Sequence, residues 1–123
     1  MIYQSVNQGV LRLVPAGARR VLDVGCGGGA FGAALKAMQE CVVVGVTHDA
    51  AEARHAERVL DRVVVADLNS FEPAAWGQFD VIVCSHVLEH LLDPARTLAR
   101  LRTCLAPGAT LLVALPNVLY WKR

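Results

Sequence analysis

Short apolar runs alternate with segments of helical spacing along this chain of 123 residues. A mostly apolar run of this length is typical of a parallel strand that is buried on both faces. Five such runs predict strands over 21–24, 41–46, 63–65, 79–84 and 109–115. Apolar residues three and four positions apart predict helices over 5–14, 31–38 and 50–60, and another that begins at Asp93-Pro94 and stops at Pro107-Gly108. Residues 71–76 form a connection or a short helix.

This alternation predicts one α/β domain over residues 1–123 with a doubly wound, Rossmann-like parallel sheet. Strands that alternate with helices through short joints imply parallel strands with right-handed crossovers. We expect the strand order 3-2-1-4-5. In such a sheet the ligand lies outside the carboxyl ends of strands one and four, where the strand order reverses. Within the helix over 50–60, Ala53, Ala56 and Leu60 should face inward, and the charged residues, Glu52 among them, should face outward.

A glycine-rich turn, Gly25-Cys26-Gly27-Gly28-Gly29, follows the first strand. Glycine adopts positive φ without steric cost and lets backbone N–H groups approach a ligand, so the turn favours a cofactor site over a plain tight turn. The spacing Gly25-x-Gly27-x-x-Ala30 also fits the dinucleotide fingerprint. Asp23 favours a different ligand, because its carboxylate repels a pyrophosphate but suits a molecule with an ammonium and a sulfonium.

At this turn the chain resembles the class I S-adenosylmethionine-dependent methyltransferases, whose first motif has the form LDVGCGxG, here Leu22–Gly29. Phe79–Val83 followed by Val87–Leu91 resembles the fourth-strand motif of the branch with ubiquinone-type O-methyltransferases and glycan-associated methyltransferases. Leu105-x-Pro107-Gly108-Ala109 with Leu115-Pro116-Asn117 resembles the same branch around strand five. The resemblance implies methyl transfer from S-adenosylmethionine to a small-molecule or glycan-type acceptor, which leaves S-adenosylhomocysteine.

The resemblance also implies cofactor-binding residues by position. Asp23 and the glycines would surround the methionine part, Asp67 would hydrogen-bond the adenine amino group, and Leu68 would pack against the ring. The alternative role for Asp67 is a turn or helix cap. The whole implied set is Asp23, Gly25, Cys26, Gly27, Gly29, Thr47, His48, Asp49, Asp67, Leu68 and Ser85.

Strand two departs from the family pattern at Thr47. The family usually has an acidic residue here, which holds both ribose hydroxyls. A threonine has one hydroxyl and no charge, so it cannot accept two strong hydrogen bonds as a carboxylate does. Asp49 either replaces that carboxylate or caps the following helix.

The end of the chain is a second departure, because family members normally continue with two more strands beside strand five. The sequence stops at Arg123, so we expect those last two strands to be missing. Residues 109–115 then form an apolar edge without a charged residue. Such edges pair with other strands, so we expect a homodimer through this edge, or poor solubility if the chain is a truncation.

A polar cluster of His86, Glu89 and His90 follows strand four. In some relatives the cluster Glu-x-x-Glu-His holds a divalent cation; here His86 replaces the first carboxylate, so we expect no metal. We expect His86 to act as a general base toward the acceptor, since an imidazole titrates near neutral pH. The alternative is that Glu89 and His90 only brace the loop. The spacing H-x-x-E-H also fits a zinc protease, but its position directly after a buried strand disfavours that function.

The composition of the chain indicates its class of protein, its partners and its compartment. With 54% hydrophobic and 19% charged residues the chain should form a well-packed globule, and a net charge of +1 indicates neither nucleic acid nor a membrane as partner. The four cysteines show no metal pattern, and no signal peptide or membrane span is evident, so we expect a cytoplasmic protein. Two other function classes stay open, a cofactor-binding remnant without turnover and a nicotinamide oxidoreductase.

Overall fold

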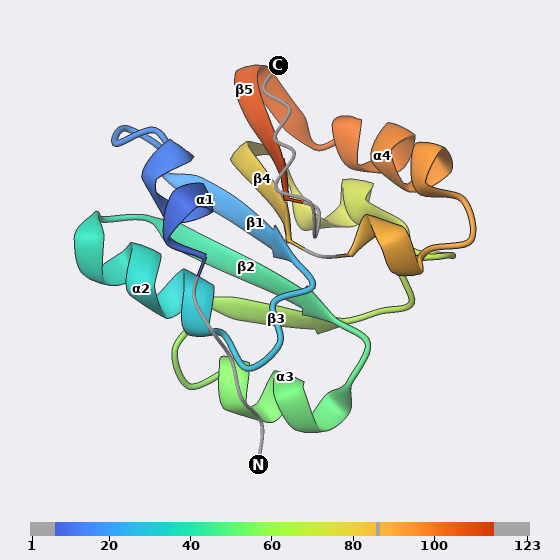
Figure 1. Ribbon diagram of the computed structural model, residues 1–123, viewed down its shortest axis with the longest axis horizontal. Helices are drawn as coiled ribbons and strands as arrows, with labels where there is room; N and C mark the ends of the chain where they lie inside the picture. The colour runs from blue at the N-terminus through green and yellow to red at the C-terminus, as the bar shows by residue number, and fades with distance from the viewer. Residues whose placement is uncertain (1–6, 86, 115–123) are drawn as a thin grey trace.

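The computed structural model describes residues 7–85 and 87–114 (Figure 1). The helices there are α1 (Gln8–Leu13), α2 (Ala30–Met38), α3 (Ala50–Ala56) and α4 (Pro94–Arg102), with the 3₁₀ helices η1 (Pro73–Trp76) and η2 (Leu88–His90). The strands are β1 (Arg20–Val24), β2 (Val42–Thr47), β3 (Arg62–Val65), β4 (Phe79–Ser85) and β5 (Leu105–Ala114). All neighbouring strands pair in parallel in the order β3-β2-β1-β4-β5, which confirms the predicted sheet.

Each face of the sheet has its own hydrophobic core, because successive residues of a strand point to opposite faces. On one face Val21 and Val43 lie in a buried cluster with residues of α1, α2 and α3. On the other face Leu22 and Ile82 lie in a cluster with residues of η1, η2 and α4. The sheet is therefore doubly wound, as predicted. Asp23, at 2% exposed, is the one charged side chain buried among the described residues.

Two helices end earlier than the apolar pattern predicts. α3 ends at Ala56 rather than at Leu60, although Leu60 stays buried because a turn, closed by its N–H bond to Ala56 O, folds it onto the core. α4 ends at Arg102, and the N–H of Cys104 then donates to Leu101 O. No helix in the described part of the chain is long and apolar enough to cross a membrane.

β5 begins at Leu105 rather than at residue 109, so Pro107-Gly108 lies within this strand. The pairing with β4 shifts register between Phe79↔Leu105 and Val81↔Thr110, which is the irregularity of a β-bulge. Gly108 has a φ of 77°, a conformation that glycine adopts without strain. Here a proline and a glycine mark a β-bulge. The sequence pattern alone does not show whether such a pair ends a helix or lies in a bulge.

The side chains in the second half of β5, over 110–114, are buried, although β5 is an outer strand of the described sheet. Residues 110–114 are at most 8% exposed and pack with α1 on one face and α4 on the other. The expected apolar edge is thus an outer strand of the described sheet, but its side chains over 110–114 are buried rather than exposed, and residue 115 lies outside the described ones. Pairing through this strand would involve its backbone.

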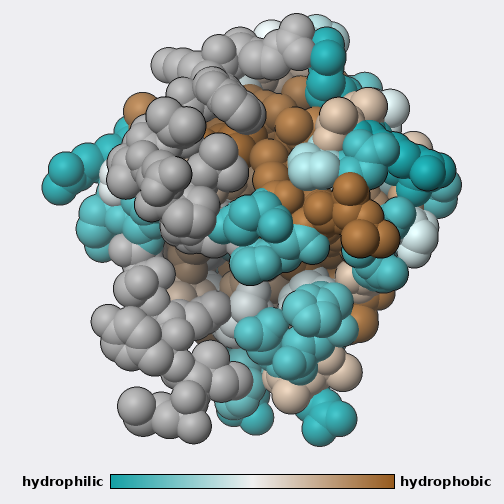
Figure 2. Space-filling model, turned by 45° about the vertical axis from the view of Figure 1, so that its right-hand side comes forward, coloured by the Kyte–Doolittle hydropathy of each residue, from teal (hydrophilic) through white to brown (hydrophobic). Residues whose placement is uncertain are grey.

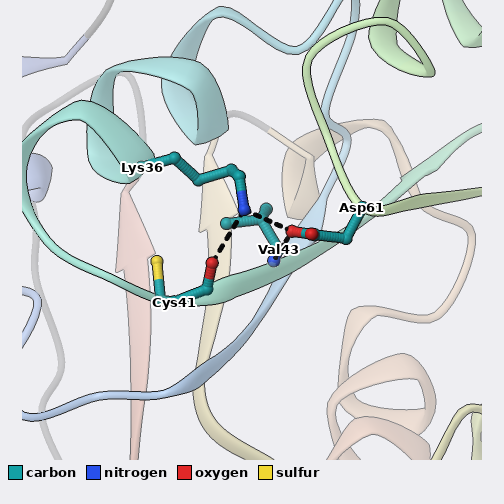
Figure 3. Close-up of polar contacts among 4 residues, drawn as sticks. All are labelled: Lys36, Cys41, Val43 and Asp61. Carbon is teal, nitrogen blue, oxygen red and sulfur yellow. Dashed lines mark hydrogen bonds and ion pairs between the residues drawn. The ribbon is translucent and has the colours of Figure 1, made fainter.

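Lys36 of α2 joins the start of β2 to the residue that precedes β3 (Figure 3). Its Nζ donates to Cys41 O at 2.8 Å and pairs with Asp61 Oδ2 at 2.6 Å. The same carboxylate oxygen accepts from the Val43 N–H at 2.8 Å. Burial raises the pKa of Asp61, but the hydrogen bonds from Lys36 and Val43 outweigh it and leave this pKa below its usual value.

Replacing Asp61 with asparagine should lower the free energy of unfolding at pH 7 by about 1 kcal/mol. The expected loss is small because the ion pair with Lys36 is partly exposed and solvent weakens it. Since the folded pKa of Asp61 is lowered, its stabilisation is present above the unfolded pKa and is lost as the pH falls through the folded value. Urea unfolding at pH 7 and pH 3 checks this, with the exposed Glu40→Gln as control. A difference of the same size at both pH values contradicts an ionic origin.

Candidate functional site

The predicted cofactor-binding residues lie at or near the carboxyl ends of four neighbouring strands, β1 to β4 (Figure 1). The glycine turn follows β1, Thr47 ends β2, Asp67 follows β3 and Ser85 ends β4. Because these strands are parallel members of one sheet, their carboxyl ends meet at the same edge. The fold thus brings together segments that are far apart in the sequence.

The glycine turn has a backbone that only glycine adopts readily. Gly25, Gly27 and Gly29 have φ values of 81°, 55° and 93°. A Cβ at Gly25 would overlap Cγ2 of Val87, and a Cβ at Gly29 would lie 3.1 Å from Cα of Ala56. The turn is therefore closely packed from both sides, and side chains are excluded from it at these positions.

Asp23 is a carboxylate buried in the sheet. It lies in β1 between Gly45 and Val83 of the adjacent strands. Its Oδ2 has no hydrogen-bond partner among the described residues, and burial raises the pKa of Asp23 to about 7. Orphaned buried carboxylates are rare because their desolvation is not offset, so this one suits a ligand that brings a cationic donor.

The thiols nearest to Asp23 are not nucleophiles. Burial and the charge of Asp23 raise the pKa of Cys26 and of Cys84 to about 12. Cys26 Sγ donates to Gly27 O at 3.4 Å. Both side chains therefore stay protonated near neutral pH and act as small packing groups.

The carboxylate at the end of β2 belongs to Glu52, which sequence reasoning placed on the outer face of its helix. Thr47, 3% exposed, donates from Oγ1 to Glu52 Oε1 at 2.9 Å. Asp49 instead caps α3, because its Oδ1 accepts from the N–H groups of Ala51 and Glu52 at 2.8 and 3.2 Å. The alternative role of Asp49 as a cap is thus the one observed, while His48 beside it is exposed.

A sequence signal for Glu52 exists in the spacing Asp49-x-x-Glu52. In this capping-box spacing the acidic side chain of the third helical residue turns back toward the start of the helix. Glu52 follows this direction, and its charge also raises the pKa of Cys26 in the glycine turn, after burial and Asp23. The carboxylate of Glu52 therefore lies within electrostatic reach of that turn.

Asp67 takes part in a turn, as the alternative for this residue predicted. Its Oδ1 accepts from the backbone N–H and from Nδ2 of Asn69, at 2.9 and 3.2 Å. No hydrogen bond to its Oδ2 occurs among the described residues, so this oxygen is open to a ligand donor. Leu68 is half-buried, and its carbonyl accepts from Thr97 Oγ1 at 3.2 Å.

Ser85, Glu89 and His90 lie where β4 leads into η2. Ser85 Oγ is buried and has no hydrogen-bond partner among the described residues. Glu89 and His90 are exposed on η2, which Leu88 anchors in the core at 5% exposed. His86 lies outside the described residues, so its position relative to Glu89 and His90 stays a prediction. Within residues 7–85 and 87–114, no three or more His, Cys, Asp or Glu residues are grouped to hold a metal ion.

Comparison with known proteins identifies the family. A family model described as a methyltransferase domain matches residues 3–123. A "Probable S-adenosylmethionine-dependent methyltransferase" of Mycobacterium tuberculosis is 37% identical over 108 residues, 86% of this chain and 39% of the relative. A ubiquinone biosynthesis O-methyltransferase of Histophilus somni is 32% identical over 109 residues, 80% of this chain and 45% of the relative.

The chain belongs to the S-adenosylmethionine-dependent methyltransferases.

A solved structure agrees with this family. The N-terminal domain of EvdMO1 with SAH bound superposes on this methyltransferase chain with a TM-score of 0.69 and 25% identity, over 79% of this chain and 42% of that one. The Rossmann-like fold and the family predicted from the motifs are confirmed. This membership sets aside the nicotinamide oxidoreductase and the zinc protease. The chain spans less than half the length of the curated relatives described above.

Proposed function

We propose that residues 1–123 form one methyltransferase domain that binds S-adenosylmethionine and supports methyl transfer to a small-molecule or glycan-type acceptor. The observation that carries the proposal is Asp23, whose buried Oδ2 lacks a partner among the described residues in the strand that leads into the glycine turn. The ammonium of the methionine part is a donor of the kind that such a carboxylate requires.

The residues present fit the cofactor. S-adenosylmethionine, when bound, supplies an electrophilic methyl group on a positively charged sulfur. Asp23 would hold the ammonium, the carboxylate of Glu52 with Thr47 would hold the ribose hydroxyls, and Asp67 would accept from the adenine amino group. The remaining contacts would come from Gly25, Cys26, Gly27, Gly29, His48, Leu68 and Ser85.

Positioning is the main contribution of the chain to the reaction, because an in-line displacement needs aligned reactants and little water. We assign His86 as the general base that removes the proton of an acceptor hydroxyl, with Glu89 and His90 on η2 orienting the acceptor. Ser85 lies at the end of β4, and its carbonyl oxygen would be 3.9 Å from a Cβ at Gly25.

Transfer of a labelled methyl group from S-adenosylmethionine to phenolic and sugar acceptors tests this function. The His86→Ala variant should retain its affinity for S-adenosylhomocysteine and lose turnover. Unchanged turnover removes His86 from the mechanism. Binding of S-adenosylhomocysteine without transfer to any acceptor would instead indicate a cofactor-binding remnant.

Replacing Glu52 with alanine should weaken S-adenosylhomocysteine binding about tenfold, the loss of one or two hydrogen bonds to a charged group. Glu57→Ala is a matched control, because it removes the same charge from the exposed end of α3. Calorimetric titration at fixed pH measures both variants. If Glu52→Ala binds as the unchanged chain does, Glu52 only braces the start of α3 through Thr47.

A homodimer through β5 is proposed from the strand's outer position in the described sheet. Pairing would use its backbone groups, since the side chains over 110–114 are already buried. Sedimentation at several protein concentrations tests it, and a monomer with rapid hydrogen exchange over 109–114 contradicts it.

A cytoplasmic location is proposed from the thiols. Cys26, Cys41, Cys84 and Cys104 are all free and buried, which suits a reducing compartment. Alkylation of the denatured protein, purified without reductant, should modify all four cysteines; a disulfide found there would contradict this location.

A further inference from the structure

Asn69 holds two segments of the site at once. Its Nδ2 donates to Asp67 Oδ1 at 3.2 Å, and its Oδ1 accepts from the Leu92 N–H at 3.0 Å. The orientation of this amide follows from chemistry, because a backbone N–H only donates and a carboxylate only accepts. The side chain of Asn69 is thus fixed at both ends, between the loop after β3 and the segment before α4.

The rest of this loop is attached to α4 by other hydrogen bonds. Thr97 Oγ1 donates to Leu68 O at 3.2 Å, and Arg100 Nη1 donates to Phe71 O at 2.8 Å. A pocket lies between α4 and the loop, and Asn69, Leu92 and Thr97 are among the residues that line it. Figure 2 shows the side of the molecule that carries α4, where hydrophilic and hydrophobic patches lie next to one another. Among these bonds, only those of Asn69 reach the carboxylate of Asp67.

Asp67 needs such a contact because its side chain is exposed. An exposed carboxylate samples several rotamers, and ordering it on binding costs conformational entropy. The two donors of Asn69 occupy Oδ1 and leave Oδ2 as the oxygen that can accept from a ligand. An acceptor fixed in this way favours a purine that presents an N–H at its 6-position and disfavours one that presents a carbonyl there.

We propose that Asn69 is a positioning residue that sets the preference for an amino-purine over an oxo-purine by fixing the carboxylate of Asp67. The proposal rests on the proposed function, in which Asp67 accepts from the adenine amino group. It adds a residue that touches no part of the cofactor and acts through Asp67. The link to Leu92 ties the same amide to the segment that follows η2.

The test compares the affinity for S-adenosylhomocysteine with that for S-inosylhomocysteine, in which an oxo group replaces the adenine amino group. Calorimetry on the 123-residue chain at pH 8 should give a preference for the amino-purine on the order of tenfold or more. Asn69→Asp keeps an acceptor for Leu92 but replaces the donor to Asp67 by a repelling oxygen. Asn69→Ala removes both side-chain contacts and leaves the backbone N–H of residue 69 as the remaining donor to Asp67 Oδ1 among the described residues. Both variants should lose most of the preference, with little change in affinity for S-inosylhomocysteine.

Thr97→Val is the matched control, because it removes a bond from α4 to the same loop without touching Asp67. It should lower the melting temperature and keep the preference. If Asp67→Ala abolishes the preference but both Asn69 variants retain it, Asn69 does not position Asp67 and the adenine role of Asp67 stands. If Asp67→Ala also retains it, or the unchanged chain shows none, Asp67 does not read the amino group and the Asn69 proposal falls with it.

Discussion

Replacing Asp23 with asparagine should weaken the binding of S-adenosylhomocysteine about 100-fold, since a charged hydrogen bond to a buried carboxylate is lost. The same substitution should stabilise the ligand-free chain at pH 8. Burial raises the pKa of Asp23 to about 7, so ionisation of this group opposes folding. The two effects have opposite signs because the carboxylate is matched to a ligand rather than to the protein.

The pH dependence of both effects follows from the same shift. Because the folded pKa of Asp23 is raised, the stability that this group contributes is full below the unfolded pKa and is lost as the pH rises through about 7. An asparagine side chain cannot ionise, so the Asp23→Asn variant should be more stable at pH 8 by about 1–3 kcal/mol, because burying a charge costs more than burying a neutral amide. Affinity for S-adenosylhomocysteine, whose ammonium would meet Asp23, should rise about tenfold between pH 6 and pH 8 in the unchanged chain and stay level in the variant.

Calorimetry at pH 6, 7 and 8 and urea unfolding at pH 8 measure these changes. Methylthioadenosine, which lacks the amino-acid part, is the matched ligand control, and its affinity should be the same in both proteins. Equal loss of affinity for both ligands would indicate a general disturbance of the sheet instead of a lost ion pair.

Replacing Gly27 with valine should abolish binding of S-adenosylmethionine and S-adenosylhomocysteine. Gly27 has a φ of 55°, which a β-branched residue adopts only under strain. A branched side chain would also fill the space through which the turn's backbone approaches the ligand. Calorimetric titration, with circular dichroism to establish folding, checks this outcome.

Gly108→Val is the control for backbone strain. Gly108 also has a positive φ, 77°, and nothing within 4 Å of the position of a Cβ. It lies in β5, away from the glycine turn, so this variant should lose stability and keep its affinity. Measurable binding by a folded Gly27→Val variant contradicts the assignment of the turn.

The fold was predictable from sequence because each buried strand is a short apolar run with a turn or helix at its end. The apolar run from Val21 to Val24, with a glycine turn directly after it, is typical of a buried parallel strand and of few other elements. Boundaries were less predictable. A Pro-Gly pair such as Pro107-Gly108 can either end a helix or lie in a bulged strand. Here the pairing of β5 with β4 places it in the bulged strand.

In the candidate site, only those residues were predictable that can be recognised from their own position in the sequence. Asp23 stands out because a charge within an apolar strand is unusual. Glu52 and Asn69 were not found, since each acts through a partner, Thr47 or Asp67, that tertiary structure brings within hydrogen-bond distance. The choice of Asp49 as helix cap also depends on a rotamer that spacing leaves open.

Calorimetric titration of the 123-residue chain with S-adenosylhomocysteine and with NAD tests most directly whether this edge of the sheet is a site for S-adenosylmethionine. S-adenosylhomocysteine should bind to one site, more tightly at pH 8 than at pH 6, and NAD should not bind. Binding of NAD without binding of S-adenosylhomocysteine would contradict the assignment.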